Sequence, residues 1–87
     1  MAFEFDPDKS RTNKIKHGID LVEAQRLWID RFLISFPARG GLESRFVAVG
    51  QIDGKHWSAI CTRRHDNIRI ISVRRSRKEE IALYEGK

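Results

Sequence analysis

The dipeptide Asp53-Gly54 constrains the fold of this chain more than any other feature of its sequence. It separates two segments rich in β-branched and aromatic residues, Ser44 to Ile52 and Lys55 to Arg64. Asp-Gly favours a two-residue turn with positive φ angles, which joins antiparallel strands without splaying them. The sequence therefore predicts a β-hairpin in which Ile52 faces Lys55, and this pairing fixes the register of both strands.

The register divides the hairpin residues between two faces of a sheet, because successive side chains point to opposite sides. The face expected to pack on the core carries Phe46, Ala48, Ile52, Trp57, Ala59 and Cys61. The opposite face mixes Val47, Val49 and Ile60 with polar residues, namely Glu43, Arg45, Gln51, His56, Ser58, Thr62 and Arg64. A mixed face is typical of a binding surface and equally of any half-exposed antiparallel sheet.

Two helices are expected before the hairpin. Asp6-Pro7 predicts the start of the first, because aspartate caps a helix N-terminus and proline is tolerated in the first turn. This helix should run to about Lys16, with Gly18 as its left-handed C-terminal cap. Asp20 and Glu23 form a capping-box pattern that opens the second helix. Its expected core face consists of Leu21, Ala24, Leu27 and Trp28.

The remaining segments complete a single domain over residues 1–87. In chain order they are an edge strand at Phe3 to Phe5, a strand from Arg31 to Phe36 ended by Pro37, a strand from Ile68 to Arg75, and a helix opened by a capping box at Ser76 to Glu79 and ending at Tyr84. The order β-α-α-β-β-β-β-α predicts an α+β fold. We expect an antiparallel sheet of four to five strands, packed by the N-terminal helices.

The register of the last strand is open between two alternatives. If Asp66-Asn67 is a two-residue turn, the polar face gains Arg69, Ile71, Val73 and Arg75. If the loop has three residues from His65, it gains Ile68, Ile70, Ser72 and Arg74 instead. A slip of one residue exchanges the two faces. Either alternative places one of Arg74 and Arg75 on the polar face, near the start of the last helix.

Positive charge is concentrated in the second half of the chain. The formal net charge is +5, and residues 1–44 have seven basic and seven acidic side chains, so the excess lies after residue 44. Between residues 63 and 78, only Asp66 opposes the basic side chains of Arg63, Arg64, Arg69, Arg74, Arg75, Arg77 and Lys78. Such clustering indicates a polyanionic partner, either a nucleic acid or an acidic protein, although a solvated basic face has the same pattern.

Several classes of protein do not fit this sequence. Cys61 is the single cysteine, which excludes an internal disulfide, and its apolar strand predicts that it is buried. No apolar run has the length of about 18 residues that a membrane span requires, and the N-terminus is too acidic for a signal peptide. We therefore expect a cytoplasmic protein without a membrane partner.

The spacing of the histidines and the cysteine fits no standard zinc site, and no nucleotide-binding loop is present, so we expect neither metal nor cofactor. The remaining chemistry is acid–base and electrostatic. Cleavage of RNA requires deprotonation of a 2′-hydroxyl, stabilisation of the phosphorane by cations, and protonation of the leaving oxygen. The candidate catalytic residues are His56, Arg64, Arg69, Arg74 and Arg75. The candidate RNA-binding residues are Lys9, Lys16, His17, Arg45, Lys55 and Arg63.

Several spaced motifs, in one order along most of the chain, resemble the BrnT family of toxins. They are Phe5-Asp6-x-x-Lys9-x-x-x-Asn13-x-x-Lys16-His17-Gly18-Ile19 with Glu23-Ala24, then Glu43-x-Arg45-Phe46-x-x-x-Gly50, Asp53-Gly54-Lys55, and Arg69-Ile70-Ile71-Ser72-Val73-Arg74 with Glu79. Phe5 departs from the family, which usually has tryptophan there.

The resemblance implies a RelE-like ribonuclease toxin of a type II toxin–antitoxin pair, which cleaves RNA and arrests translation. It also implies a BrnA-like ribbon-helix-helix antitoxin as partner and binding of operator DNA only through that antitoxin. The residues alone leave two alternatives. One is an inhibitory toxin that cuts nothing and acts on a gyrase-type target, and the other is a plain nucleic-acid-binding module. The stripe of Lys9, Asn13 and Lys16 along the first helix is expected to touch either RNA or antitoxin.

Overall fold

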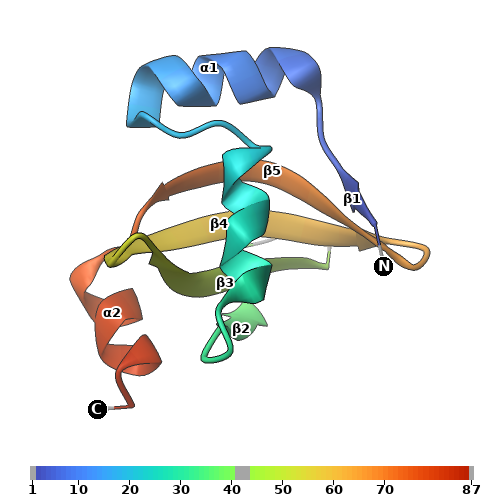
Figure 1. Ribbon diagram of the computed structural model, residues 1–87. Coiled ribbons are helices and arrows are strands. Elements are labelled where there is room, and N and C mark those ends of the chain that lie inside the picture. The colour runs from blue at the N-terminus through green and yellow to red at the C-terminus, as the bar shows by residue number, and fades with distance from the viewer. Residues whose placement is uncertain (1, 41–43, 87) are drawn as a thin grey trace.

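The computed structural model describes residues 2–40 and 44–86, which form one five-stranded sheet flanked by helices (Figure 1). In chain order the elements are β1 (Phe3–Glu4), α1 (Pro7–His17), η1 (Glu23–Ile29), β2 (Ile34–Pro37), β3 (Arg45–Ile52), β4 (Lys55–Arg64), β5 (Asn67–Arg75) and α2 (Lys78–Tyr84). The strand order across the sheet is β1-β5-β4-β3-β2.

The sheet is mixed, so the expectation of a purely antiparallel sheet is wrong. Strand β1 pairs in parallel with β5, placing Phe3 beside Ile68, whereas every other neighbouring pair is antiparallel. The backbone N–H of Ile68 donates to the carbonyl oxygen of Ala2 at 2.9 Å. A strand of two residues contains too little pattern to predict whether it pairs in a parallel or an antiparallel manner. Its orientation depends on the path of the chain between β1 and β5.

The predicted hairpin is confirmed. Ile52 pairs with Lys55, Arg45 pairs with Thr62, and Asp53 has a φ of 51°, as the Asp-Gly turn requires. Ala48, Ala59 and Cys61 are fully buried on the predicted core face, and Phe46 and Trp57 pack against them. Burial raises the pKa of the Cys61 thiol to about 12.

The opposite face of the hairpin is partly covered by α2 and is not an open polar surface along its whole length. Val49 and Ser58 are fully buried there, and Val47 is 5% exposed. Ser58 donates a hydrogen bond to the carboxylate of Glu80 on α2 at 2.9 Å, which explains how a hydroxyl is buried at this position. Of the residues predicted for this face, Glu43 lies outside the described residues.

Strand β5 follows neither predicted register completely. Its turn is His65-Asp66, so Arg64 pairs with Asn67, and His65 has a positive φ of 58°. Cys61 pairs with Ile70 but Ile60 pairs with Ser72, which leaves Ile71 as a β-bulge. The bulge reverses the alternation of side chains. Residues before it therefore follow one predicted alternative, and residues after it follow the other.

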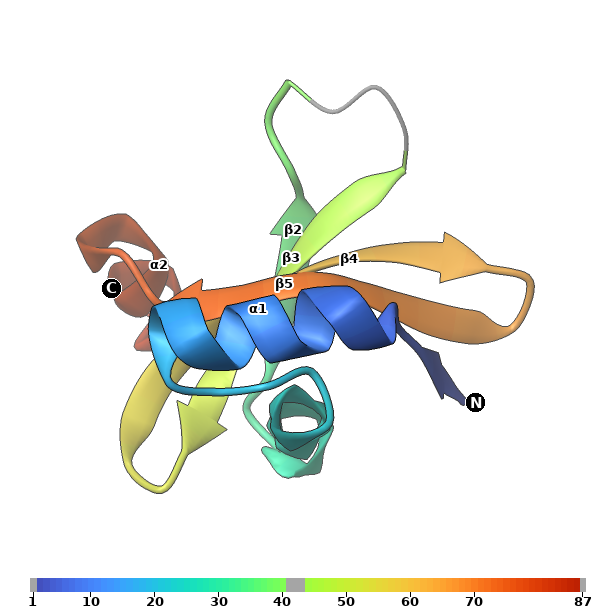
Figure 2. The same ribbon diagram turned by 90° about the horizontal axis from the view of Figure 1, so that it is seen from above.

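Helix α1 runs along β5 (Figure 2). Polar side chains attach it to the sheet. The amide of Asn13, which is 6% exposed, donates to the carbonyl oxygens of Val73 and Ile19 at 2.8 Å each and accepts from the N–H of Val73 at 3.1 Å. Ser10 accepts from the N–H of Leu21 at 2.9 Å. The apolar Ile15 is exposed. Asn13 is thus directed inward, where its side chain binds the backbone of β5, whereas Lys9 and Lys16 of the same predicted stripe are exposed.

The second predicted helix is a 3₁₀-helix, η1, which crosses one face of the sheet (Figure 1). The capping-box bonds between Asp20 and Glu23 are present at 2.7 and 2.9 Å, and Leu21, Ala24 and Leu27 are fully buried. Seven residues is a long run for a 3₁₀-helix, whose hydrogen-bond geometry is poorer than that of an α-helix, and burial of its apolar side holds the segment in place.

The start of β2 and the capping box of α2 lie at other residues than predicted. The carboxylate of Asp30 accepts from the N–H of Phe32 at 2.9 Å, so the chain turns there and β2 begins at Ile34. Pro37 lies within β2, which is an edge strand and therefore tolerates proline. The last capping box uses Arg77 and Glu80, one residue later than predicted, because Glu80 is also bound by residues of the sheet.

Candidate nucleic-acid interface

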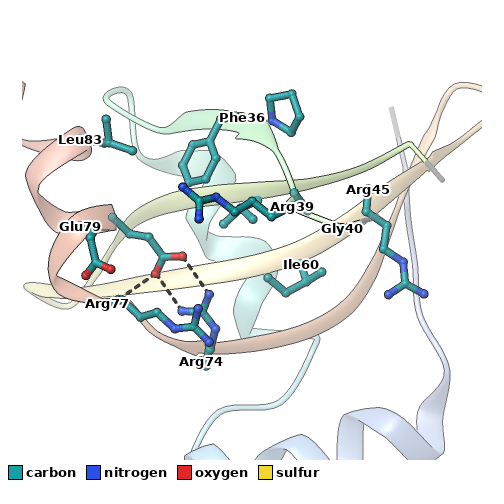
Figure 3. Close-up of a pocket in the computed structure, with 13 residues that line it drawn as sticks. Phe36, Arg39, Gly40, Arg45, Ile60, Arg74, Arg77, Glu79 and Leu83 are labelled. Carbon is teal, nitrogen blue, oxygen red and sulfur yellow. Dashed lines mark hydrogen bonds and ion pairs between the residues drawn. The ribbon is translucent and has the colours of Figure 1, made fainter. Parts of the chain in front are cut away.

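A groove of about 680 Å³ lies on the sheet face that carries α2 (Figure 3). Its floor includes Val47 and Ile60, and the ring of Phe36 and the side chain of Leu83 border it. The groove, called the arginine groove below, has four basic residues among its lining, namely Arg39, Arg45, Arg74 and Arg77. Guanidinium groups around an apolar floor match a nucleotide, whose phosphate is anionic and whose base is flat and apolar on its faces.

Arg74 is held in the groove by Glu80 in a bidentate ion pair. The two guanidinium nitrogens donate to the two carboxylate oxygens at 2.8 Å each, and Glu80 also accepts from the N–H of Arg77 at 2.8 Å. Ser58 lies between Glu80 and Ser76, whose hydroxyl is 2.7 Å from its own. The ion pair with Arg74 lowers the pKa of Glu80 to about 2. Glu80 therefore stays ionised and positions Arg74, and it cannot exchange protons with a substrate near neutral pH.

Glu79 is the other carboxylate that lines the arginine groove. It occupies the first turn of α2 and is exposed, whereas its neighbour Glu80 is 8% exposed. An exposed carboxylate beside cationic side chains can approach a bound phosphodiester and accept a proton from an attacking hydroxyl. Of the two carboxylates in the groove lining, Glu79 is thus the one that is accessible to solvent.

The structure separates the predicted catalytic residues. Arg74 lies in the arginine groove, but Arg75 follows it to the other face, where its guanidinium lies 5.4 Å from the ring centroid of Trp57. Arg69 and Arg64 lie toward the other end of β5 and β4, about 16 Å and about 23 Å from Arg74 along the strands at about 3.3 Å per residue. Arg69 forms a 3.5 Å ion pair there with Glu4.

His56, the predicted acid–base residue, contacts Gln51, Tyr84 and Glu85 at the end of the hairpin. Its Nε2 atom lies 2.9 Å from a carboxylate oxygen of Glu85 and 3.2 Å from the side-chain amide of Gln51. Its ring packs edge-on against Tyr84, with centroids 5.3 Å apart. Tyr84 in turn donates to Asp30 at 2.7 Å, so these contacts hold the end of α2 against the rest of the molecule.

The predicted RNA-binding residues fall into three places. Arg45 lines the arginine groove. Lys9, Lys16 and His17 line a second, smaller pocket between α1 and β5. The other two are Lys55, exposed at the Asp53-Gly54 turn, and Arg63, which stacks at 5.0 Å on the ring of Phe46.

Several residues of the groove are not among the site residues predicted from the sequence, including Phe36, Arg39, Arg77, Glu79 and Glu80. Arg77 belongs to the basic cluster between residues 63 and 78, and Glu79 ends the predicted capping box, so both had a signal in the sequence. Phe36 and Arg39 had none, because their place in the groove depends on how β2 and the following residues fold over β3.

Across the described residues, no three or more histidine, cysteine, aspartate or glutamate side chains are grouped to hold a metal ion. Within residues 2–40 and 44–86, none of the helices is long and apolar enough to span a membrane. A comparison with curated proteins finds no significant match.

A comparison with protein families finds one that accounts for most of the chain. The model of the ribonuclease toxin BrnT, of type II toxin–antitoxin systems, matches residues 5–80. This span includes α1, the whole hairpin, the bulged strand β5 with Arg74, and the start of α2 with Glu79 and Glu80. The chain therefore belongs to the BrnT family of ribonuclease toxins of type II toxin–antitoxin systems.

Proposed function

We propose that the arginine groove is the site at which this toxin cleaves RNA as an endoribonuclease. The observation that carries the proposal is the meeting of four arginines and the exposed carboxylate of Glu79 around one apolar floor. The two kinds of group supply what transesterification of RNA needs, namely charge stabilisation at phosphorus and a proton acceptor.

In the proposed reaction, Glu79 accepts the proton of the 2′-hydroxyl as its oxygen attacks the neighbouring phosphorus. Arg74 and Arg77 bind the non-bridging oxygens and stabilise the additional negative charge of the phosphorane. The bond from phosphorus to the 5′-oxygen then breaks, and this oxygen leaves as a hydroxyl after taking a proton from solvent. The products are a 2′,3′-cyclic phosphate and a 5′-hydroxyl end, and the reaction needs no metal.

The other predicted catalytic residues have different roles in this proposal. Arg64, Arg69 and Arg75 lie away from the reacting phosphate and attract the RNA through long-range electrostatics. His56 positions the end of α2, which forms one wall of the groove, through Glu85 and Tyr84.

We further propose that cleavage takes place in the cytoplasm and arrests translation, and that the fold is of the RelE type. Membership of a type II toxin–antitoxin family supports an antitoxin partner. We propose a BrnA-like ribbon-helix-helix protein in this role, with operator DNA bound only through it.

The substitution Glu79→Gln tests the site. It preserves the shape of the side chain and removes the proton acceptor, so we expect kcat for cleavage of a single-stranded RNA to fall at least about 100-fold, as is usual for loss of a general base. The end groups of the products, analysed for cyclic phosphate, report the predicted transesterification.

Arg31→Gln is the matched control, because Arg31 is exposed and stacks on Phe32 away from the groove. Thermal unfolding of both variants verifies that they are folded. Cleavage by Glu79→Gln at the wild-type rate would show that the arginine groove is not the active site, or that Glu79 is not its base.

A further inference from the structure

The second pocket lies between α1 and β5 and has a volume of about 340 Å³. Its lining, called the α1 pocket below, is mostly basic or polar and consists of Asp8, Lys9, Thr12, Asn13, Lys16, His17, Ile71 and Ser72. Lys9 and Lys16 are both exposed and lie seven residues apart, so they project from one side of α1 with about 10 Å of helix between them. The pocket is therefore built to receive an anion.

The α1 pocket and the arginine groove adjoin each other across the sheet. Ser72 lines the α1 pocket, and its partner on β4 is Ile60, which lines the arginine groove. Paired residues of antiparallel strands have Cα atoms only about 5 Å apart. Figure 3 shows the same relation, with α1 lying beyond β5 from the labelled side chains of the groove.

The β-bulge brings Ser72 to this face. Because Ile71 has no partner on β4, Ser72 and Arg74 both share the face of Ile60 and Ser58. The two residues lie two positions apart on β5, so the Cα atoms of Ser72 in the α1 pocket and Arg74 in the arginine groove are about 7 Å apart along the strand. One chain of phosphates can contact both.

We infer that the α1 pocket is a phosphate-binding subsite for the same RNA strand that occupies the arginine groove. The inference rests on the proposed function of that groove and adds the path of the substrate: a single strand of several nucleotides crosses β4 and β5 and reaches Lys9 and Lys16. A strand of RNA presents one phosphate per nucleotide, which suits a row of cations better than a single anion does.

The chemistry of α1 favours RNA over a protein at this pocket. The apolar Ile15, which a protein interface would cover, lies on the opposite side of α1 from the buried Ser10 and Asn13 and does not line the pocket. Asp8 borders the pocket, but its carboxylate is paired with Arg11. The pocket thus combines cations and small polar groups with one apolar residue, Ile71, which is only partly exposed.

The salt dependence of RNA binding tests the inference. The variant with Lys9→Gln and Lys16→Gln is compared with a control variant with Arg11→Gln and Lys14→Gln. The control loses the same charge from the other flank of α1, where Arg11 pairs with Asp8 and Lys14 pairs with Glu23. All proteins also carry Glu79→Gln, so that a labelled RNA decanucleotide of mixed sequence stays intact while fluorescence anisotropy measures its Kd.

Each phosphate contact with a single strand contributes about 0.7 to the slope of log Kd against log salt. We expect the Lys9/Lys16 variant to lower that slope by about 1.4 and to weaken binding at least about 10-fold at low salt, relative to the Arg11/Lys14 variant. Equal slopes and affinities for the two variants would overturn the inference. Such a result would leave the proposed active site standing, because that site is tested separately by the cleavage rate of Glu79→Gln alone.

Discussion

Glu80 joins the fold to the arginine groove at the level of a single side chain. It receives hydrogen bonds from Arg74, Ser58 and the backbone of Arg77, and it is 8% exposed. A carboxylate with so many donors is stabilised in its charged form, which is why its pKa falls from 4.5 to about 2. Its role is to orient Arg74 and to fasten the first turn of α2 to the sheet.

This lowered pKa predicts a pH-dependent stability. Because the pKa is lower in the folded protein than in the unfolded chain, the stabilisation is present above pH 4.5 and is lost as the pH falls toward 2. We expect it to be on the order of 3 kcal/mol at neutral pH. Glu80→Gln should lack most of this pH dependence, as measured by urea denaturation at pH 7, 4.5 and 3.

The exposed neighbour provides the control for that measurement. Glu79→Gln changes the same chemical group one residue away, where the carboxylate is accessible to solvent. Its free energy of unfolding should follow the wild-type pH profile. A Glu80→Gln variant with the same profile as wild type would contradict the role assigned to the ion pair.

Asn13 shows why inward and outward polar residues are hard to distinguish from the sequence. Helix α1 contains almost no apolar residues, so it has no periodic apolar face from which its buried side could be predicted. Asn13 falls on the same stripe as Lys9 and Lys16 by spacing alone. Its burial depends on the backbone of Val73, which is 60 residues away in the chain.

At the scale of elements, the contact between η1 and β3 depends on the absence of a side chain at Gly50. A Cβ atom there would lie 3.1 Å from the carboxylate of Asp30, 3.1 Å from Leu33 and 3.2 Å from Leu27. The same carboxylate accepts hydrogen bonds from Tyr84 and from the N–H of Gln51. Close approach at Gly50 therefore helps to fix the positions of η1 and α2 relative to β3.

We predict that Gly50→Ala destabilises the protein by about 1–3 kcal/mol, the usual cost of overpacking a well-packed site. The midpoint of urea unfolding at constant pH measures the effect. Ala48→Gly is a companion on the same strand, because it changes one methyl group at a fully buried position without introducing a clash. If Gly50→Ala has wild-type stability, the contact is looser than these distances indicate.

The elements differ in how well the sequence predicts them, and the reason is local chemistry. The Asp53-Gly54 turn specifies its own geometry, so it determined the pairing of β3 with β4 and the core face of both strands. A β-bulge has no comparable signature, because Ile71 suits a regular strand as well as a bulged one. For the same reason the sequence could place only one of Arg74 and Arg75 on the functional face without deciding between them.

At the scale of the whole molecule, the stability of the toxin should be coupled to its ligand. A domain of 87 residues buries a modest share of its surface, and part of this one is held by polar contacts at α1 and α2. The arginine groove spans elements from β2 to α2, so a strand of RNA bound there connects distant segments of the chain. Binding that occurs only in the folded state raises the free energy of unfolding.

We predict that a single-stranded RNA decanucleotide at 100 times its Kd stabilises the Glu79→Gln protein by about 2.7 kcal/mol. For a domain of this size that corresponds to an increase in Tm of about 10 °C or more, measured by differential scanning calorimetry. Removing two groove cations with Arg39→Gln and Arg77→Gln should reduce the shift at the same RNA concentration. A Tm that does not respond to RNA would be inconsistent with binding across the sheet.

The single unpaired residue of β5 also has a genetic consequence. An in-frame loss of the Ile71 codon would leave Ser72 paired with Ile60 and Arg74 paired with Ser58, now in a regular ladder, so both side chains would keep their face. A related toxin whose strand is one residue shorter at this point would therefore present the same arginine to the groove. Among related genes, a difference of one residue in the length of this strand would then not by itself mark an inactive toxin.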